Sequence, residues 1–67
     1  MMEIELNGTP HALQQGACIA DLVAALDLAG KALAIAVNRE VVPRQQWLHR
    51  RLQEQDRVDI VRAIGGG

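Results

Sequence analysis

The sequence predicts one α+β domain in which a single helix covers one face of a small mixed sheet. Three observations support this fold class. Short segments alternate apolar and polar residues, one segment has the apolar spacing of a helix, and a chain of 67 residues is too short for a second core. We expect the domain to span residues 1–64 and a flexible glycine tail to follow at 65–67.

The first two strands are expected to form a hairpin. Met2–Leu6 alternates apolar and acidic residues, as a half-buried strand does. Asn7-Gly8 follows, and this dipeptide favours a two-residue hairpin turn because both positions tolerate a positive φ. Thr9–Leu13 should therefore return as an antiparallel strand, with Gln14–Ala17 as a short connection.

The next segment, Cys18–Leu28, has the periodicity of a helix of about three turns. Its apolar stripe at i, i+3, i+4 and i+7 consists of Ile19, Leu22, Val23 and Leu26. Asp21 lies in the first turn, where the helix dipole favours a negative charge. Gly30 is expected to end the helix, because glycine is common just beyond a helix C-terminus.

Two further strands are expected after the helix. In Leu33–Val37 bulky residues alternate with alanines, which favours a strand in the interior of the sheet. Asn38-Arg39 is interpreted as a tight turn into a brief strand at Glu40–Val42. Pro43 ends that strand because it has no backbone N–H to donate, and together with Arg44 it shapes the following turn.

The C-terminal part of the chain begins with a polar, irregular segment at residues 44–52, with one helical turn expected near 45–48. Asp56 then starts the last strand, Val58–Ile64, which leads into Gly65-Gly66-Gly67. The predicted order is therefore hairpin, helix, short strands and one long final strand.

Composition excludes several classes of function. The chain is 49% hydrophobic, but Trp47 is its one aromatic residue, so it lacks the stacking residues of single-strand binders. We interpret Trp47 as a cover for the core rather than a binding hot spot. The net charge of −1 gives no general attraction to nucleic acid or to anionic membranes. A deep substrate pocket would take up most of so small a core, which argues against an independent enzyme.

The cysteine content and the start of the chain indicate a location. One cysteine cannot form an internal disulfide, and no leader or membrane-spanning stretch opens the sequence. We therefore expect a cytoplasmic protein whose fold depends on packing alone.

The usual catalytic and metal-binding groups are sparse. The chain has no Ser or Tyr, and Cys18 lies at the start of the predicted helix, where a structural role is favoured over a reactive thiol. His11 and His49 are far apart in sequence and lack further ligands at metal-binding spacing, so no metal site is expected. Glu3 and Glu5 are interpreted as a solvated strand face rather than as an acid–base pair.

Composition does not explain the three glycines at 65–67. The alternatives are an unselected end or a leftover linker, but a glycine stalk with a terminal carboxylate could also enter a narrow active site of another protein. That carboxylate is ionised at neutral pH and is a poor electrophile. We therefore expect a partner enzyme to adenylate Gly67 with ATP. Attack by an amine would then make the protein a modifier, and attack by sulfur would make it a sulfur donor.

The predicted elements and the glycine end resemble the ubiquitin-like β-grasp fold. More specifically, three segments resemble the ThiS family, the bacterial sulfur carriers of thiamine biosynthesis. These segments are Val37–Trp47, with its Val-Asn, Val-Pro-Arg and Trp elements, Asp56-Arg57-Val58, and Ala63-Ile64-Gly65-Gly66-Gly67. The similarity covers essentially the whole chain.

The resemblance implies a mechanism and a set of partners. An E1-like enzyme of the ThiF type would adenylate Gly67 with ATP, a sulfur-donor enzyme would supply sulfur, and a thiazole synthase of the ThiG type would receive it from the thiocarboxylate. Gly66 would complete the terminal diglycine. The carrier itself would bind no cofactor and would catalyse no reaction. Apart from the resemblance, we expect the free protein to be a monomer.

The chain departs from the ThiS pattern at two positions. Gln55 stands where a Gly-Asp turn is usual, so we expect this turn to form without a positive φ. Cys18 stands where Thr or Ser commonly caps the helix. Neither position touches the tail, so both bear on stability rather than on function.

The last strand provides the expected partner surface. If Val58 and Ile60 point into the core, then Asp59, Val61 and Ala63 point outward, which leaves Val61 and Ala63 exposed beside the tail. Arg62 and Ile64 lie at the base of the tail and are further candidate contacts. The alternative interpretation is that these are ordinary exposed aliphatic residues, which need no explanation when they are scattered.

Three other functions stay open on the sequence alone. A carrier for molybdenum-cofactor synthesis would share the mechanism, although the Val-Pro-Arg and Trp elements favour thiamine. A protein modifier would form isopeptide bonds, and the presence of a single lysine, Lys31, disfavours chain building on the protein itself. If the protein were an interaction module with an incidental tail, removal of the glycines would leave its function unchanged.

Overall fold

The computed structural model describes residues 1–62. The predicted strand end and tail at 63–67 therefore lie outside the described residues. The elements are β1 (Met2–Leu6), β2 (Thr9–Leu13), α1 (Ile19–Ala25), β3 (Leu33–Val37), β4 (Glu40–Val41), the 3₁₀ helix η1 (Arg44–Gln46) and β5 (Arg57–Arg62).

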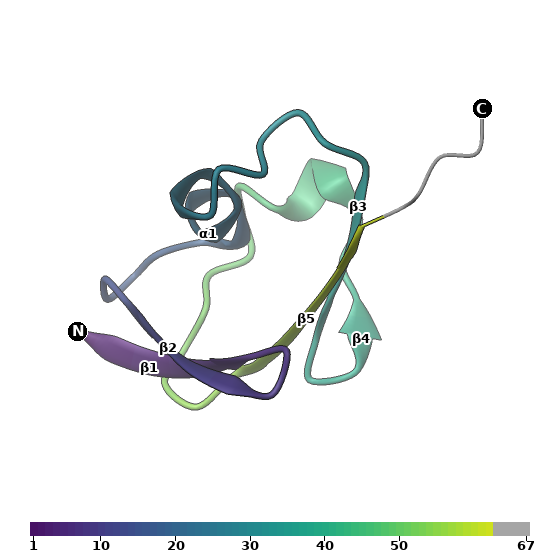
Figure 1. Ribbon diagram of the computed structural model, residues 1–67. Helices are drawn as coiled ribbons and strands as arrows, with labels where there is room; N and C mark the ends of the chain where they lie inside the picture. Colours follow the sequence, from purple (N-terminus) through teal and green to yellow (C-terminus); the bar gives the residue numbers. More distant parts are fainter. Residues whose placement is uncertain (63–67) are drawn as a thin grey trace.

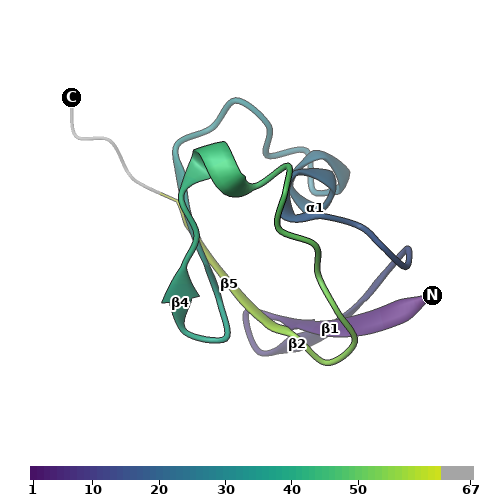
Figure 2. The same cartoon turned by 180° about the vertical axis from the view of Figure 1, so that it is seen from behind.

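The strands form one mixed sheet with the order β2-β1-β5-β3-β4. β1 and β5 run parallel, and the other neighbouring strands run antiparallel. α1 covers one face of this sheet, and the N-terminus and the end of β5 lie on opposite sides of the molecule (Figures 1 and 2). The predicted fold class, a small mixed sheet covered by one helix, is confirmed.

Two tight turns connect β1 with β2 and β3 with β4, as predicted. Asn7 and Gly8 between β1 and β2 have φ values of 49° and 83°, and Asn38 and Arg39 between β3 and β4 have 52° and 70°. Positive φ at both central positions is the type I′ geometry, whose twist matches that of the flanking strands.

The helix is shorter than the predicted Cys18–Leu28, and the prediction that Gly30 ends it is wrong. α1 ends at Ala25, and Asp27 takes the left-handed conformation at φ 59°. The Leu28 N–H donates to the Val23 carbonyl at 3.0 Å, and the Asp27 N–H donates to the Ala24 carbonyl at 3.0 Å. These two bonds form a Schellman motif, which turns Leu28 back against the core three residues after the helix ends.

The hydrophobic core lies between α1 and the inner face of the sheet. Its fully buried side chains are Ile4, Ile19, Leu22, Ile35, Val37 and Val58. Trp47 is also buried, and its indole N–H donates to the Val42 carbonyl at 2.9 Å. The interpretation of Trp47 as a cover for the core is therefore confirmed, because its one polar atom is paired inside the fold.

The loop before β5 contains a second correction to the sequence analysis. Gln55 has φ 70°, so the turn before Asp56 does adopt a left-handed residue, although no glycine is present. Such a residue costs roughly 1–2 kcal/mol. The buried carboxylate of Asp56 closes the turn by accepting a hydrogen bond from the Gln53 N–H at 2.8 Å, and the Gln55 N–H donates to the Glu3 carbonyl at 2.8 Å. These bonds hold Gln55 in a conformation it would not choose in isolation.

The remaining loop follows the sequence analysis closely. η1 begins directly after Pro43 and lies one residue earlier than the predicted helical turn. Arg44 shapes this segment, because its guanidinium lies 5.1 Å from the Trp47 ring centroid. Within the part of the chain that the structure describes, no helix is long and apolar enough to cross a membrane.

Candidate functional site

The first half of β5 is held by neighbouring strands on both sides. Arg57 and Val58 pair in parallel with Glu5 and Leu6 of β1. On the opposite side the whole of β5 pairs antiparallel with β3. Val58 has no exposed surface, so this half of the strand is anchored in the core.

Two asparagine side chains extend this anchoring beyond the strand ladders. Asn7 Oδ1 accepts the Ile60 N–H at 2.8 Å, and Asn7 Nδ2 donates to the Ile60 carbonyl at 3.4 Å. Asn38 Oδ1 accepts the Arg57 N–H at 3.0 Å, and its Nδ2 donates to Asp56 Oδ1 at 3.1 Å. The sequence analysis identified both asparagines as turn residues and missed that their side chains fasten β5.

The second half of β5 is more exposed. Val61 is 63% exposed and Arg62 is exposed, and their recorded strand partners are Ala34 and Leu33 of β3. Val58 and Ile60 face the core, as the alternation predicted. The exposure of Val61 is therefore as predicted, while the role of Val61 and Arg62 in binding stays a prediction.

The other predicted site residues follow residue 62. Ala63 and Ile64, and the glycines Gly65, Gly66 and Gly67, lie outside the described residues. The structure thus describes the strand that leads to the proposed reacting group and the first two of the four candidate contacts.

The outer face of the sheet adds apolar surface next to Val61. Register pairs Val61 with Ala34, and Val41 of β4 with Ala36, so these four side chains share the face turned away from α1. Val41 is 71% exposed. The sequence analysis did not predict this group, because its members come together only through the β3 register.

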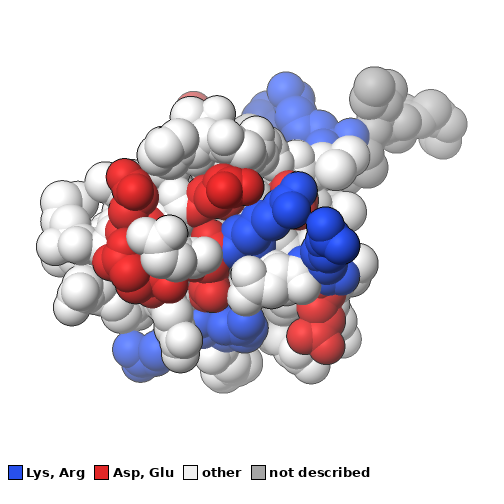
Figure 3. Space-filling model, turned by 90° about the horizontal axis from the view of Figure 1, so that it is seen from below, with Lys and Arg blue, Asp and Glu red and all other residues white. Residues whose placement is uncertain are grey.

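Charged side chains flank this apolar surface. Arg57 Nε lies 3.8 Å from a carboxylate oxygen of Glu5 and 3.8 Å from one of Asp59. Figure 3 looks onto the molecule from the side opposite α1, and it shows acidic side chains gathered over one half of the view with basic side chains beside them. Glu3 and Glu5 are exposed here, as predicted for a solvated strand face.

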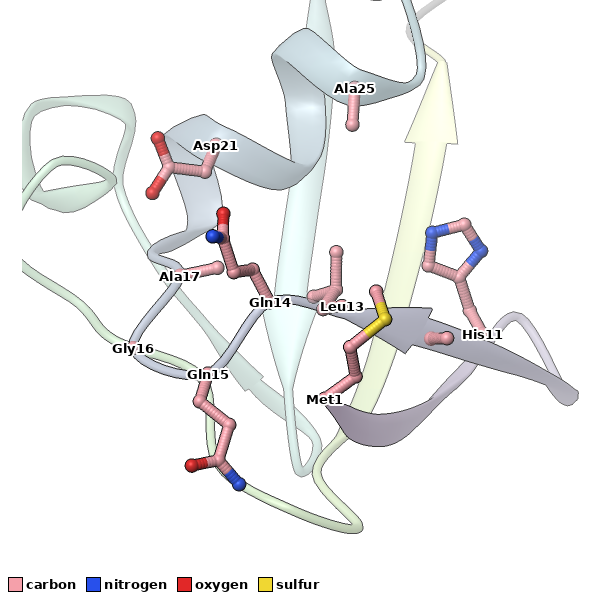
Figure 4. Close-up of a pocket in the computed structure, with 10 residues that line it drawn as sticks. Met1, His11, Leu13, Gln14, Gln15, Gly16, Ala17, Asp21 and Ala25 are labelled. Atoms are coloured by element: carbon pink, nitrogen blue, oxygen red, sulfur yellow. The ribbon is translucent and has the colours of Figure 1, made fainter.

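A cavity of about 490 Å³ lies beside β2, at the edge of the sheet away from β3 and β4. It is bounded by β2, the loop that follows and α1, and His11, Gln14 and Asp21 are among its polar residues (Figure 4). None of its lining residues belongs to β3 or β5. The cavity is therefore separate from the strand that leads to the glycines.

The start of α1 accounts for Cys18. This cysteine is buried and is the N-cap residue of α1. Its backbone N–H donates to Asp21 Oδ2 at 3.0 Å, and its thiol donates to the same oxygen at 3.3 Å. These bonds, led by that from the backbone N–H, lower the pKa of Asp21 below its ordinary value of 3.8. The predicted structural role of Cys18 is consistent with this geometry.

The two histidines do not come together in a site. His11 lies half-buried on β2, and His49 is exposed in the turn after η1. Within residues 1–62 there is no group of three His, Cys, Asp or Glu side chains that could hold a metal ion. Residues 1–62 thus present the exposed end of β5 and the apolar outer face of the sheet as surfaces for binding. They do not bring together a set of catalytic side chains.

Comparisons with known proteins point to one family. A model described as the ThiS family matches residues 4–67. The chain is 30% identical over 66 residues to the sulfur carrier protein ThiS of Escherichia coli, covering 98% of this chain and 100% of that protein. It is also 38% identical over 66 residues to a thiazole synthase of Magnetococcus marinus, of which it spans 20% of the length.

Solved structures agree with these sequence matches. The crystal structure of a thiamine biosynthesis protein, ThiS, from Geobacter metallireducens superimposes with a TM-score of 0.85 at 25% identity, covering 98% of this chain and all of that one. A solution structure of a thiamine biosynthesis protein from Geobacter metallireducens gives a TM-score of 0.80 at 25% identity, over 98% of this chain and 88% of the other. The resemblance to the β-grasp fold expected from the sequence is therefore confirmed.

Proposed function

The chain belongs to the ThiS family, the sulfur carriers of thiamine biosynthesis, and from this premise we propose that it carries sulfur as a thiocarboxylate on Gly67. It is a carrier and not a catalyst. Membership of the ThiS family favours thiamine biosynthesis over molybdenum-cofactor synthesis, which the sequence alone left open.

The proposed chemistry begins at the carboxylate of Gly67. An enzyme of the ThiF type transfers AMP from ATP to this carboxylate and releases pyrophosphate, which makes the carbonyl carbon electrophilic. A sulfur nucleophile, provided through a sulfur-donor enzyme, then forms the C–S bond and displaces AMP. The carrier needs no bound cofactor for these steps, because ATP is bound by the activating enzyme.

The observation that carries the proposal is the contrast within β5. Its first half is fixed by β1, β3 and two asparagine side chains, and its second half reaches Val61 and Arg62 with both side chains exposed. Such a strand presents whatever follows it from a rigid base. We propose that the contacts with partner enzymes are made by Val61, Arg62, Ala63 and Ile64, with residues 65–67 as the tail.

A thiazole synthase of the ThiG type is the proposed acceptor of the sulfur. Support comes from the Magnetococcus marinus thiazole synthase, which contains a region similar to this whole chain. The exposed apolar group of Val61, Ala34, Ala36 and Val41 provides a surface for such a protein contact. The proposed reaction uses ATP and serves the biosynthesis of a small molecule, and both favour a cytoplasmic location.

The experiment is an intact-mass measurement after incubation with ATP, sulfide and a ThiF-type enzyme. We expect one oxygen of the protein to be replaced by sulfur, and fragmentation to locate that sulfur at Gly67. Reactions without ATP should leave the mass unchanged. The variant Cys18→Ser should still gain sulfur, because its thiol is buried at the start of α1.

Two outcomes would contradict the proposal. The first is an unchanged mass when the Escherichia coli carrier reacts under the same conditions. The second is sulfur that is lost with Cys18→Ser, which would locate the sulfur on the thiol.

A further inference from the structure

Three cationic residues, Lys31, Arg44 and Arg62, lie at the end of the sheet where β5 finishes. Arg44 Nη2 donates a hydrogen bond to the Lys31 carbonyl at 2.6 Å. Leu33, two residues after Lys31, is the register partner of Arg62. The segment before β3, the segment after β4 and the last residue of β5 therefore meet at this end, and each contributes one cation.

These three charges are exposed and have no carboxylate partner in the described part of the chain. Both ion pairs recorded within residues 1–62 belong to Arg57. Lys31, Arg44 and Arg62 are all exposed. The Arg44 guanidinium lies against the Trp47 ring, which fixes the position of its charge while leaving it in contact with solvent.

The acidic side chains are concentrated elsewhere. Glu5 and Asp59 pair with Arg57, and the Glu3 N–H donates to a Glu54 carboxylate oxygen at 3.0 Å, so these groups lie around β1 and the first half of β5. A chain with a net charge of −1 thus has a locally positive surface at one end of β5. Screening over about 10 Å keeps this local charge distinct from the acidic region.

We propose that Lys31, Arg44 and Arg62 form a basic docking surface for an acidic surface beside the active site of the adenylating enzyme. The inference rests on the proposed function at Gly67. Gly67 is the fifth residue after Arg62, a span of at most ~18 Å in extended chain. An enzyme that takes the Gly67 carboxylate into its active site therefore has protein surface within reach of all three cations.

The expected effect follows from the exposure of these charges. Exposed charges at the rim of an interface act mainly on association and on its salt dependence. The basic docking surface should therefore lower the KM for the carrier at low ionic strength and leave kcat unchanged. A change in KM without a change in kcat would distinguish an effect on docking from an effect on the chemistry at Gly67.

The test measures carrier-dependent exchange of pyrophosphate into ATP by a ThiF-type enzyme. The variant Lys31→Gln with Arg62→Gln removes two charges and leaves the Arg44–Trp47 contact in place. We expect its KM to rise about fivefold at low salt, with kcat unchanged, and its KM to depend less on salt than that of the wild type. The charge-conserving variant Lys31→Arg with Arg62→Lys should keep the wild-type KM.

The matched control removes two positive charges from the other end of the domain. Arg39→Asn changes a residue of the β3–β4 turn, where Asn tolerates the positive φ, and Arg50→Gln changes a residue near the start of α1. This control pair should keep the wild-type KM.

An equal rise in KM for the control pair would overturn the proposal, because net charge alone would then explain the effect. An unchanged KM for Lys31→Gln with Arg62→Gln would overturn it as well. Failure of the proposed function has a different signature, since the wild-type chain would then support no pyrophosphate exchange at all.

Discussion

The two halves of β5 belong to one strand but to different environments. Arg57–Ile60 is held by β1, β3 and the side chains of Asn7 and Asn38, and Val58 is completely buried. Val61 and Arg62 have register partners in β3 and expose their side chains. The first half is built like a core strand and the second like a binding surface.

This difference teaches how a domain of 67 residues can present a reactive group. Its core is small and leaves little room for an internal active site. The buried and doubly paired residues of β5 lie in its first half, and the surface that we propose for partner contacts lies in its second. Substitutions in the two halves should therefore separate folding from function.

The largest effect is expected from removing the proposed tail. Deletion of Gly66 and Gly67 should abolish thiocarboxylate formation and thiazole formation, because the carboxylate would stand on a shorter stalk that cannot reach the adenylation site. Glycine has no side chain to pack, and terminal residues contribute little to a core, so the thermal unfolding temperature should stay nearly unchanged. Intact mass and calorimetry on the same preparation measure both properties. A large loss of stability would show that the tail also supports the fold, and would contradict the separation of folding from function.

A matched pair of valine substitutions compares the two halves directly. Val58→Ala should lower the free energy of unfolding by about 2–3 kcal/mol, because it leaves a cavity in the core. That is a large share of the roughly 5 kcal/mol typical of so small a domain. Val61→Ala removes the same atoms from an exposed position and should cost less than about 0.5 kcal/mol. Urea denaturation gives both values.

The same pair should give the opposite order in partner reactions. Val61→Ala should raise the KM for the carrier, since an apolar contact is lost, whereas Val58→Ala should keep it under conditions where the variant is folded. If Val61→Ala destabilised the fold as much as Val58→Ala, the second half of β5 would be structural and the comparison between the two halves would fail.

Much of this fold could be predicted because local signals agree with tertiary packing. The type I′ turns at Asn7-Gly8 and Asn38-Arg39 follow from residues that tolerate positive φ, and the alternation in the strands fixes their buried faces. Predictions were wrong at two other left-handed residues, Asp27 and Gln55. They take this conformation because packing of Leu28 and hydrogen bonds around Asp56 offset the local cost.

The candidate site was predictable in part for a related reason. Alternation along the last strand predicted that Val61 is exposed, since this depends on one strand alone. The contributions of Val41, Lys31 and Arg44 depend on which segments become neighbours, and no local pattern contains that information. The side-chain clamps of Asn7 and Asn38 were missed for the same reason.

The two asparagine clamps offer a finer test of the first half of β5. Asn38→Gly and Asn7→Gly both preserve the type I′ turn and remove the side-chain hydrogen bonds to β5. Asn38→Gly should cost about 2 kcal/mol, because it also takes a partner from the buried Asp56 carboxylate. Asn7→Gly should cost about 1 kcal/mol.

Hydrogen exchange would locate these effects. Asn7→Gly should speed exchange of the Ile60 amide, because the Asn7 side chain accepts a hydrogen bond from that N–H. Asn38→Gly should speed exchange of the Arg57 amide for the same reason. Unchanged exchange at both amides would show that the strand ladders alone anchor β5.

The smallest effect is expected from Asp21, at the start of α1 and far from the end of β5. Hydrogen bonds from Cys18 lower its pKa below the ordinary 3.8, so the ionised carboxylate stabilises the folded state. That contribution is present above the ordinary value and is lost as the pH falls through the lowered pKa. Asp21→Asn should therefore reduce the unfolding temperature slightly at neutral pH, and its difference from the wild type should shrink well below pH 3.8. Glu40→Gln, which removes one negative charge from exposed β4, is the matched control for the loss of charge alone. Because Asp21 lies at the start of α1, away from the end of β5, its loss should leave the KM for the adenylating enzyme unchanged, and a raised KM would mean that the start of α1 also contacts the partner.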